Sequence, residues 1–180
     1  MDSALIIIDM QQEMQARIDA GRPHVNGDAP AKVAALAAAF RAAGQGVIHV
    51  RHAEADPASP LHPDAPGYPP MPCAIEWAGE AIFVKRSSSA FATTDLADHL
   101  RAIGSPKLHV IGAVAGFCVN STVRAAADLG FQVDVVADAV LGFDLPGQDA
   151  QTIFDVTMAL LAADFARITD SAAAIATVYG

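Results

Sequence analysis

The sequence predicts a three-layer α/β fold, in which one doubly wound, mainly parallel sheet of six strands carries helices on both faces. Two observations lead to this fold class. Short runs rich in Val, Ile and Leu alternate along the 180 residues with longer segments of helical pattern, as in strand–helix–strand units. Hydrophobic residues make up 53% of the chain, enough to bury such a sheet. We find no repeat and no linker, so residues 1–180 are expected to form one domain.

Six apolar runs are the expected strands. Most of them are short stretches rich in Val, Ile and Leu, which is typical of parallel strands covered on both faces. The first run is Ala4-Leu5-Ile6-Ile7-Ile8, and it ends at Asp9. The six runs lie at residues 4–8, 47–50, 81–84, 108–111, 133–136 and 166–169.

Five segments have the pattern of helices: residues 30–40, 94–103, 118–129, 148–165 and 172–178. Pro30 suits the first turn of the first helix, and Gly44 lies just past its end. Thr94 can cap the second helix. The segment 148–165 is apolar around most of its circumference. One sheet face would not cover such a helix, so we expect a subunit interface here and a homodimer or homotetramer.

Two long segments are expected to be loops. Residues 10–28 are polar and contain Gly21, Pro23 and Gly27, so we interpret them mainly as a loop. Residues 53–72 contain seven prolines and show no periodicity. We expect residues 53–80 to form a Pro-rich loop or lid over a binding site, because long loops within a domain commonly have that function.

The composition narrows the classes of partner and location. The net charge is −9, and such a surface repels phosphate backbones, so we expect no nucleic-acid partner. The first residues lack the basic and apolar regions of a signal peptide, and no run is long enough to span a membrane. Cys73 and Cys118 do not form a CxxC pair. Two such free thiols suit a reducing compartment, and we expect a cytoplasmic protein without a membrane partner.

Reactive side chains follow three of the expected strands: Asp9 after the first, Lys85 after the third and Cys118 just past the fourth. Ligands of doubly wound sheets bind at the carboxyl ends of the strands. Cys118 also begins an expected helix, where the backbone N–H groups favour a thiolate. Each residue has a simpler interpretation. Asp9 can cap the next segment, Lys85 can be a solvated cation, and Cys118 can be a small buried apolar residue.

Three motifs in this order carry a resemblance to a known family. They are Leu5-Ile6-Ile7-Ile8-Asp9-Met10-Gln11, then Val84-Lys85-Arg86 followed by Ser89-Ala90-Phe91, and Gly112-Ala113-Val114-Ala115-Gly116-Phe117-Cys118-Val119. Over nearly its whole length, the chain resembles the cysteine hydrolases of the isochorismatase-like superfamily, which include nicotinamidases, N-carbamoylsarcosine amidases and ureidoacrylate amidases. The resemblance implies catalytic roles for Asp9, Lys85 and Cys118. It also implies a cis peptide bond between Ala113 and Val114 and a pocket position for Phe91.

The chemistry implied by the resemblance is hydrolysis of a small amide or carbamoyl C–N bond without a cofactor. Asp9 would take the thiol proton, and Lys85 would stabilise the thiolate. The sulfur would attack the carbonyl carbon of a small-molecule substrate. The oxyanion would be met by the backbone N–H groups of Val114 and Cys118. Asp9 would then protonate the leaving ammonia or amine, and water would hydrolyse the thioester.

Departures from the nicotinamidase pattern argue against a metal. Nicotinamidases carry an Asp-x-His motif where this chain has His49-Val50-Arg51-His52, and the missing aspartate makes nicotinamide a poor candidate substrate. A second set of possible ligands, His52, Asp56, His62 and Asp64, lies around the Pro-rich loop, where lone histidines are more often solvated. We therefore expect no metal.

The candidate substrate-binding residues are Phe91, Arg51, Trp77 and Phe117. Arg51, like Arg86, lies near a strand end and could pair with a substrate carboxylate, although an exposed arginine is an equally good interpretation. Trp77 could belong to a lid or simply anchor its loop.

Other functions stay open at this point. The chain could be a catalytically silent member of the same fold that binds a ligand or assembles through its apolar helix. It could also be an isochorismatase-type vinyl-ether hydrolase, although such enzymes can lack the cysteine that is present here. A nucleotide-binding domain is disfavoured, because Asp9-Met10-Gln11 stands where a GxGxxG turn would be.

Overall fold

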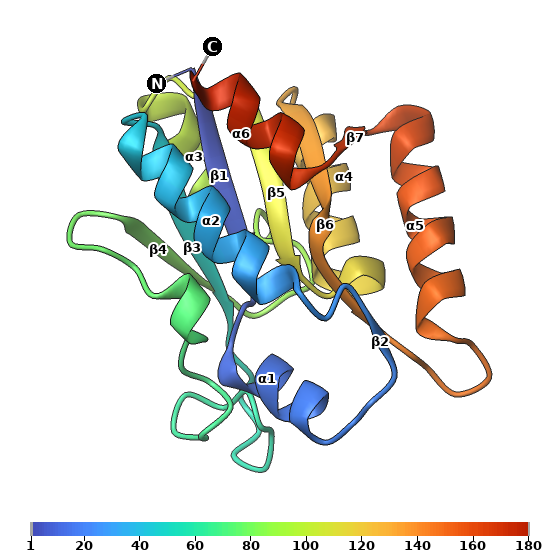
Figure 1. Ribbon diagram of the computed structural model, residues 1–180. Helices are drawn as coiled ribbons and strands as arrows, with labels where there is room; N and C mark the ends of the chain where they lie inside the picture. Colours follow the sequence, from blue (N-terminus) through green and yellow to red (C-terminus); the bar gives the residue numbers. More distant parts are fainter. Residues whose placement is uncertain (1, 180) are drawn as a thin grey trace.

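The computed structural model describes residues 2–179 and is built around a parallel sheet (Figure 1). Six parallel strands follow the order β4–β3–β1–β5–β6–β7. Their bounds are β1 Ser3–Ile8, β3 Gly46–His52, β4 Ala81–Lys85, β5 Lys107–Ala113, β6 Gln132–Phe143 and β7 Arg167–Thr169. A two-residue strand, β2 (His24–Val25), adds an antiparallel pair at the end of β6. The six parallel strands are those that the sequence predicts.

Helices cover both faces of the sheet, which confirms the three-layer α/β fold. Helices α2 (Ala29–Ala42) and α6 (Ser171–Tyr179) lie on the face toward the viewer in Figure 1. On the other face lie α3 (Leu96–Ala102), α4 (Asn120–Asp128) and α5 (Ala150–Asp164). Side chains of β1 alternate between the two layers, with Leu5 and Ile7 toward α2 and Ile6 and Ile8 toward the other helices.

Two of the local predictions need correction. The segment 10–28, expected to be mainly a loop, contains the helix α1 (Gln12–Asp19). This helix lies beyond the strand ends, and Met14 is the one fully buried residue in it, so it has no apolar stripe to reveal it. The second correction concerns Cys118. It lies in a π-helical turn, η2 (Ala115–Val119), which precedes α4 rather than belonging to it.

The end of the Pro-rich segment, residues 67–71, is hydrogen-bonded to the start of the chain. After Ala53, its regular structure among the described residues is the short 3-10 turn η1 (Pro72–Ala74). The backbone N–H groups of Gln12 and Glu13 donate to the carbonyls of Pro69 and Gly67 at 2.8 and 2.9 Å. The loop therefore packs against α1 at the end of the sheet where the strands terminate.

Helix α5 leaves apolar side chains uncovered. Val156 and Leu160 are 54% and 53% exposed, in agreement with the all-round apolar pattern of the sequence. The expected contact with a second copy stays a prediction. Within residues 2–179, no helix combines the length and the apolar character that crossing a membrane requires.

Candidate active site

Asp9, Lys85 and Cys118 lie together where the parallel strands end. Nζ of Lys85 lies 2.7 Å from Oδ2 of Asp9 and 3.2 Å from Sγ of Cys118. Lys85 is fully buried and Asp9 is 4% exposed. Because β3 separates β4 from β1, the side chain of Lys85 reaches past the end of β3 to meet Asp9. A carboxylate, an ammonium and a thiol thus lie within one cluster, in which Lys85 and Asp9 are buried.

The backbone around this cluster is unusual at several points. Asp9 has a φ of +47°, in the left-handed region that few residues other than glycine adopt. Its N–H donates to the carbonyl of Val50 at 2.9 Å. On the neighbouring strand, Gly112 has a φ of +117°, and a Cβ there would lie 2.0 Å from the carbonyl oxygen of Ile8. Only glycine permits this close approach of β5 to β1. The peptide bond between Ala113 and Val114 is cis.

A fourth side chain, His52, contacts the cluster. It is the last residue of β3, and the register of β3 and β4 places it directly beside Lys85. Its Nδ1 lies 2.9 Å from Nζ of Lys85, and its Nε2 lies 3.3 Å from Oε1 of Glu54. In the sequence, His52 stood out only as a possible metal ligand. Knowledge of the strand order would have been needed to find its contact with Lys85.

Gln11 holds the backbone of His52 in place. Its Oε1 accepts from the N–H of His52 at 2.9 Å, and its Nε2 donates to the carbonyls of His52 and Tyr68 at 3.1 and 2.8 Å. The side chain is 1% exposed. Gln11 therefore ties the end of β3 to the Pro-rich loop. The sequence suggested no role for this residue.

Burial dominates the electrostatics of the cluster. It raises the pKa of the Cys118 thiol to about 12, with the charge of Asp9 adding to the rise and Lys85 opposing it. Burial also raises the pKa of Asp9, against the lowering effect of the Lys85 ammonium. Burial and the charge of Asp9 therefore favour the protonated thiol, against the thiolate that a helix N-terminus was expected to favour. An attack by this sulfur needs a base, and the neighbouring carboxylate can supply it.

Of the residues considered as metal ligands, His52 lies close to other possible ligands in the cluster. Asp9, His52 and Cys118 offer ligand atoms within 4.8 Å of one another. However, Nζ of Lys85 bonds to all three of these side chains, and its positive charge competes with a cation at this place. In the Pro-rich loop, His62 contacts Asp64 at 3.7 Å.

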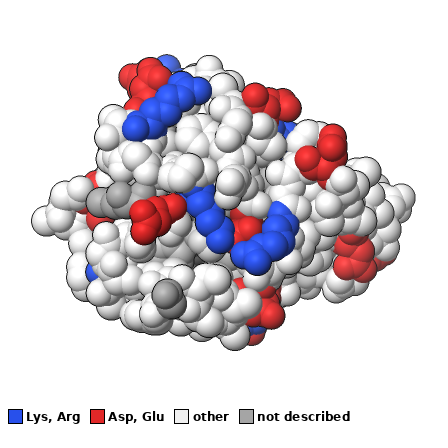
Figure 2. All heavy atoms as spheres, turned by 90° about the horizontal axis from the view of Figure 1, so that it is seen from above, with Lys and Arg blue, Asp and Glu red and all other residues white. Residues whose placement is uncertain are grey.

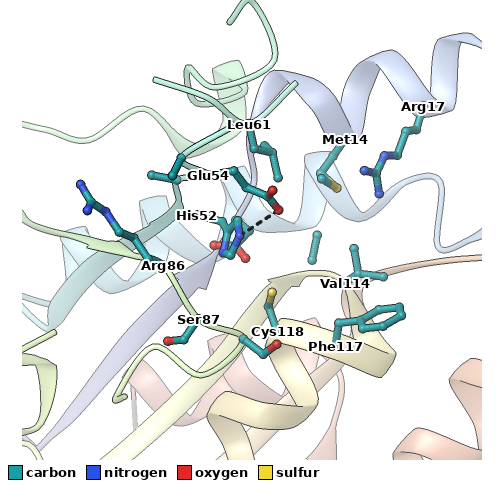
Figure 3. Close-up of a pocket in the computed structure, with 15 residues that line it drawn as sticks. Met14, Arg17, His52, Glu54, Leu61, Arg86, Ser87, Val114, Phe117 and Cys118 are labelled. Atoms are coloured by element: carbon teal, nitrogen blue, oxygen red, sulfur yellow. Dashed lines mark ion pairs between the residues drawn. The ribbon is translucent and has the colours of Figure 1, made fainter. Parts of the chain in front are cut away.

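A cavity of about 580 Å³ opens onto the cluster (Figure 3). In this view, the sulfur of Cys118 faces the cavity, Met14 and Arg17 come from α1, and Glu54 projects beside His52. The guanidinium of Arg86 points away from Cys118. The lining residues are Asp9, Met14, Arg17, His52, Ala53, Glu54, Ala55, Leu61, Arg86, Ser87, Ser88, Ala113, Val114, Phe117 and Cys118.

Of the four candidate substrate-binding residues, Phe117 lines the cavity and three lie elsewhere. Arg51 is on the α2 face of β3, because side chains alternate along a strand, and it pairs with Glu76. Trp77 is 62% exposed outside the cavity, with the guanidinium of Arg41 over its ring. Phe91 is partly buried and packs against the core, with its ring stacked on Phe131.

The opposite end of the sheet carries a different kind of surface. Figure 2 looks onto the end where the strands begin, and acidic and basic side chains are interspersed there. Asp134 pairs at this end with Lys107 at 3.2 Å and with Arg167 at 2.6 Å. In the described residues, the end where the strands begin thus carries ion pairs such as those of Asp134. The cavity lined by Cys118 lies at the opposite end, where the strands terminate.

The fold and this cluster define a class of protein: an α/β protein in which a buried carboxylate and a buried ammonium lie beside a thiol at the carboxyl ends of the strands. The sequence profile of the isochorismatase domain matches residues 3–173. The chain therefore belongs to the isochorismatase family, whose members include hydrolases.

Individual relatives agree with this assignment. The chain is 32% identical over 177 residues to the secreted isochorismatase effector Isc1 of Verticillium dahliae, covering 94% of this chain and 88% of that protein. A crystal structure of an isochorismatase-family protein from Chromobacterium violaceum superposes with a TM-score of 0.92 at 33% identity, covering 99% and 94% of the two chains. A cysteine hydrolase from Pseudomonas syringae pv. phaseolicola, 23% identical over 98% of this chain and 92% of its own, shares the fold with a TM-score of 0.90.

Proposed function

We propose that this hydrolase cleaves the C–N bond of a small amide or carbamoyl compound through a thioester on Cys118. The observation that carries the proposal is the position of the Lys85 ammonium, which bonds to the carboxylate of Asp9 and to the sulfur of Cys118 at once. A cysteine becomes a good nucleophile when a base and a cation lie within hydrogen-bonding distance. The cavity onto which Cys118 faces has the size of a small-molecule site.

In the first step, the carboxylate of Asp9 accepts the proton of the Cys118 thiol as the sulfur attacks the substrate carbonyl carbon. The raised pKa of Asp9 suits this role, because a base with a higher pKa competes better for the proton. The ammonium of Lys85, 3.2 Å from Sγ, stabilises the negative charge that develops on sulfur. The carbonyl double bond opens, and its electron pair moves to oxygen.

In the second step, the tetrahedral intermediate collapses. The backbone N–H groups of Val114 and Cys118, both residues of the cavity wall, are proposed to donate to the oxyanion. Loss of one such donor typically costs about 2.7–4 kcal/mol of activation free energy. The C–N bond breaks, the proton on Asp9 passes to the leaving nitrogen, and ammonia or an amine departs. Water then attacks the thioester, releasing the acid and returning the proton to Cys118.

The experiment that tests the proposal is an ammonia-release screen over small primary amides, ureido acids and carbamoyl compounds. The wild type is compared with Cys118→Ala and with Cys73→Ala as a matched control. Cys73 is also partly buried, and burial raises its thiol pKa to about 11, but it does not line the cavity. We expect ammonia from the wild type and Cys73→Ala only. Equal release by wild type and Cys118→Ala would show that Cys118 is not the nucleophile.

A second candidate function is vinyl-ether hydrolysis of the isochorismatase type. The observation that favours it is the name of the Verticillium dahliae relative, an isochorismatase effector. Adding isochorismate to the screen separates the two reactions. Pyruvate released equally by wild type and Cys118→Ala would support the vinyl-ether reaction, whereas cysteine-dependent ammonia release supports the amidase.

We also propose that two or four copies assemble through the outer face of α5, where Val156 and Leu160 are exposed. Burial of such side chains between copies removes apolar surface from water. Light scattering after gel filtration should give the mass of a dimer or tetramer, and Leu160→Glu should lower it. A monomeric wild type would contradict the assembly.

The cytoplasm is the proposed location, supported by the two free cysteines, Cys73 and Cys118. A secreted relative points the other way. Fractionation of the native cell decides between them, with recovery in the medium contradicting the proposal.

A further inference from the structure

The ammonium of Lys85 has one partner that the proposed mechanism does not use. A protonated lysine carries three N–H donors and no acceptor. In the structure, Nζ lies 2.7 Å from Asp9, 3.2 Å from Cys118 and 2.9 Å from Nδ1 of His52. The side chain is completely buried, so water does not supply the third acceptor. His52 therefore completes the coordination of the ammonium.

This contact fixes the tautomer of His52. Because a protonated Lys85 can only donate, Nδ1 of His52 must be the acceptor and its proton must be on Nε2. Nε2 then faces Oε1 of Glu54 at 3.3 Å, the contact drawn as a dashed line in Figure 3. Glu54 lines the cavity and its side chain is 48% exposed. A chain of contacts thus runs from Cys118 through Lys85 and His52 to the cavity rim.

The backbone of His52 is hydrogen-bonded in addition to the contacts of its ring. Gln11 bonds to both its N–H and its carbonyl, and the β3–β4 register sets His52 directly beside Lys85. The groups that face the imidazole are the ammonium of Lys85, the carboxylate of Glu54 and, within the same cluster, Asp9 and Cys118. These contacts place the imidazole beside Nζ of Lys85.

We propose that His52 is a positioning residue, which holds the Lys85 ammonium between Asp9 and Cys118 by accepting its third N–H. This inference rests on the proposed function, in which Lys85 stabilises the sulfur. Without the acceptor, one N–H of a buried cation has no partner, which is costly. The ammonium then turns toward another acceptor and its contact with Sγ weakens. The nucleophile loses its cation although Asp9, Lys85 and Cys118 are all present.

The test compares His52→Asn with His52→Leu. These two replacement side chains have nearly the same shape, but only Asn places an oxygen where Nδ1 of His52 stands. Glu54→Gln serves as a control, because it removes the carboxylate charge near Nε2 and leaves the contact of Nδ1 with Lys85 in place. The measured quantity is the rate constant for alkylation of Cys118 by iodoacetamide from pH 6 to 10, followed by peptide mass spectrometry. This readout needs no substrate, so it is independent of the ammonia-release screen.

We expect His52→Leu to slow alkylation at least about tenfold across this range, the size of one lost charged hydrogen bond. His52→Asn and Glu54→Gln should remain within about threefold of wild type. On any amide that is turned over, His52→Leu should lower kcat more than it changes KM. If His52→Leu fails to fold in circular dichroism and melting experiments, His52→Ala replaces it in the comparison.

Two results would overturn the inference. One is alkylation of His52→Leu at the wild-type rate. The other is an equal slowing in His52→Asn and His52→Leu, which would mean that the ring's shape matters rather than its acceptor. Failure of the proposed function looks different: Cys118→Ala then turns over substrate as the wild type does, whatever the alkylation rates of the His52 variants.

Discussion

Replacing Lys85 by Met should destabilise the protein in a pH-dependent manner. Met keeps much of the apolar stem of the lysine but removes its charge. The ammonium lies 2.7 Å from Oδ2 of Asp9, and with an effective dielectric constant of about 20 their attraction is about 6 kcal/mol. Desolvation offsets part of this, and removing one partner of a buried pair costs about 3–5 kcal/mol. We expect the free energy of unfolding to fall by about that amount at pH 8.

The pH dependence follows from the remaining carboxylate. Burial already raises the pKa of Asp9, and Lys85 is the main group that lowers it, so the variant should have a higher pKa still. A carboxyl with a raised pKa in the folded state contributes stability below its unfolded pKa and loses it as the pH rises through the folded pKa. The Lys85→Met variant should therefore lose more stability at pH 8 than at pH 5.

Urea denaturation followed by circular dichroism at both pH values measures this loss. The matched control is the double variant Asp9→Asn/Lys85→Met, which leaves no buried charge and should recover most of the stability at pH 8. A Lys85→Met protein as stable as the wild type at pH 8 would refute the reasoning. So would an equal loss in the double variant.

Three further predictions concern pH and packing. The acid limb of kcat/KM should report a pKa above 3.8, because burial raises the pKa of Asp9 from that value; an acid limb below 3.8 would argue against Asp9 as the base. Burial lowers the pKa of His109 from 6.5 to about 4, so stability present above pH 6.5 should be lost as the pH falls toward 4, by about 3 kcal/mol. Urea denaturation at several pH values should show that His109→Gln loses less free energy of unfolding than the wild type as the pH falls. The same pH dependence in the two proteins would contradict this. Gly112→Ala should lower the melting temperature sharply, since its Cβ would lie 2.0 Å from the Ile8 carbonyl oxygen. A variant that melts at the wild-type temperature would contradict this.

The sequence predicts the layers and the rim of the site because both depend on local patterns. Continuous apolar runs specify buried parallel strands, and a reactive residue directly after a run must lie near the carboxyl rim. Asp9, Lys85 and Cys118 could be assigned to that rim for this reason. Their actual distances depend on the strand order, in which β3 lies between β1 and β4. Spacing along the chain does not encode that order.

The errors at the site have physical reasons. Arg51 and His52 are neighbours in sequence, but alternation along β3 sends Arg51 to Glu76 and leaves His52 beside Lys85. The expectation of a thiolate at Cys118 took account of the helix terminus but not of burial. Burial has the larger effect on the pKa of this thiol. Both errors come from tertiary surroundings that a one-dimensional pattern does not contain.

The wall of the cavity was beyond prediction for a similar reason. Helix α1 contributes Met14 and Arg17 to it, yet its polar sequence gives no periodic signal. Gln11 bonds to three backbone groups from different parts of the chain. Such a role becomes visible only when the Pro-rich loop and the end of β3 are placed beside each other.

Acid-quench mass spectrometry during turnover tests the central claim most directly. With an amide found in the screen, the account predicts an added mass equal to the acyl group, located on the peptide that contains Cys118 and absent from Cys118→Ala. An unmodified Cys118 peptide during turnover, together with full activity of Cys118→Ala, would contradict it.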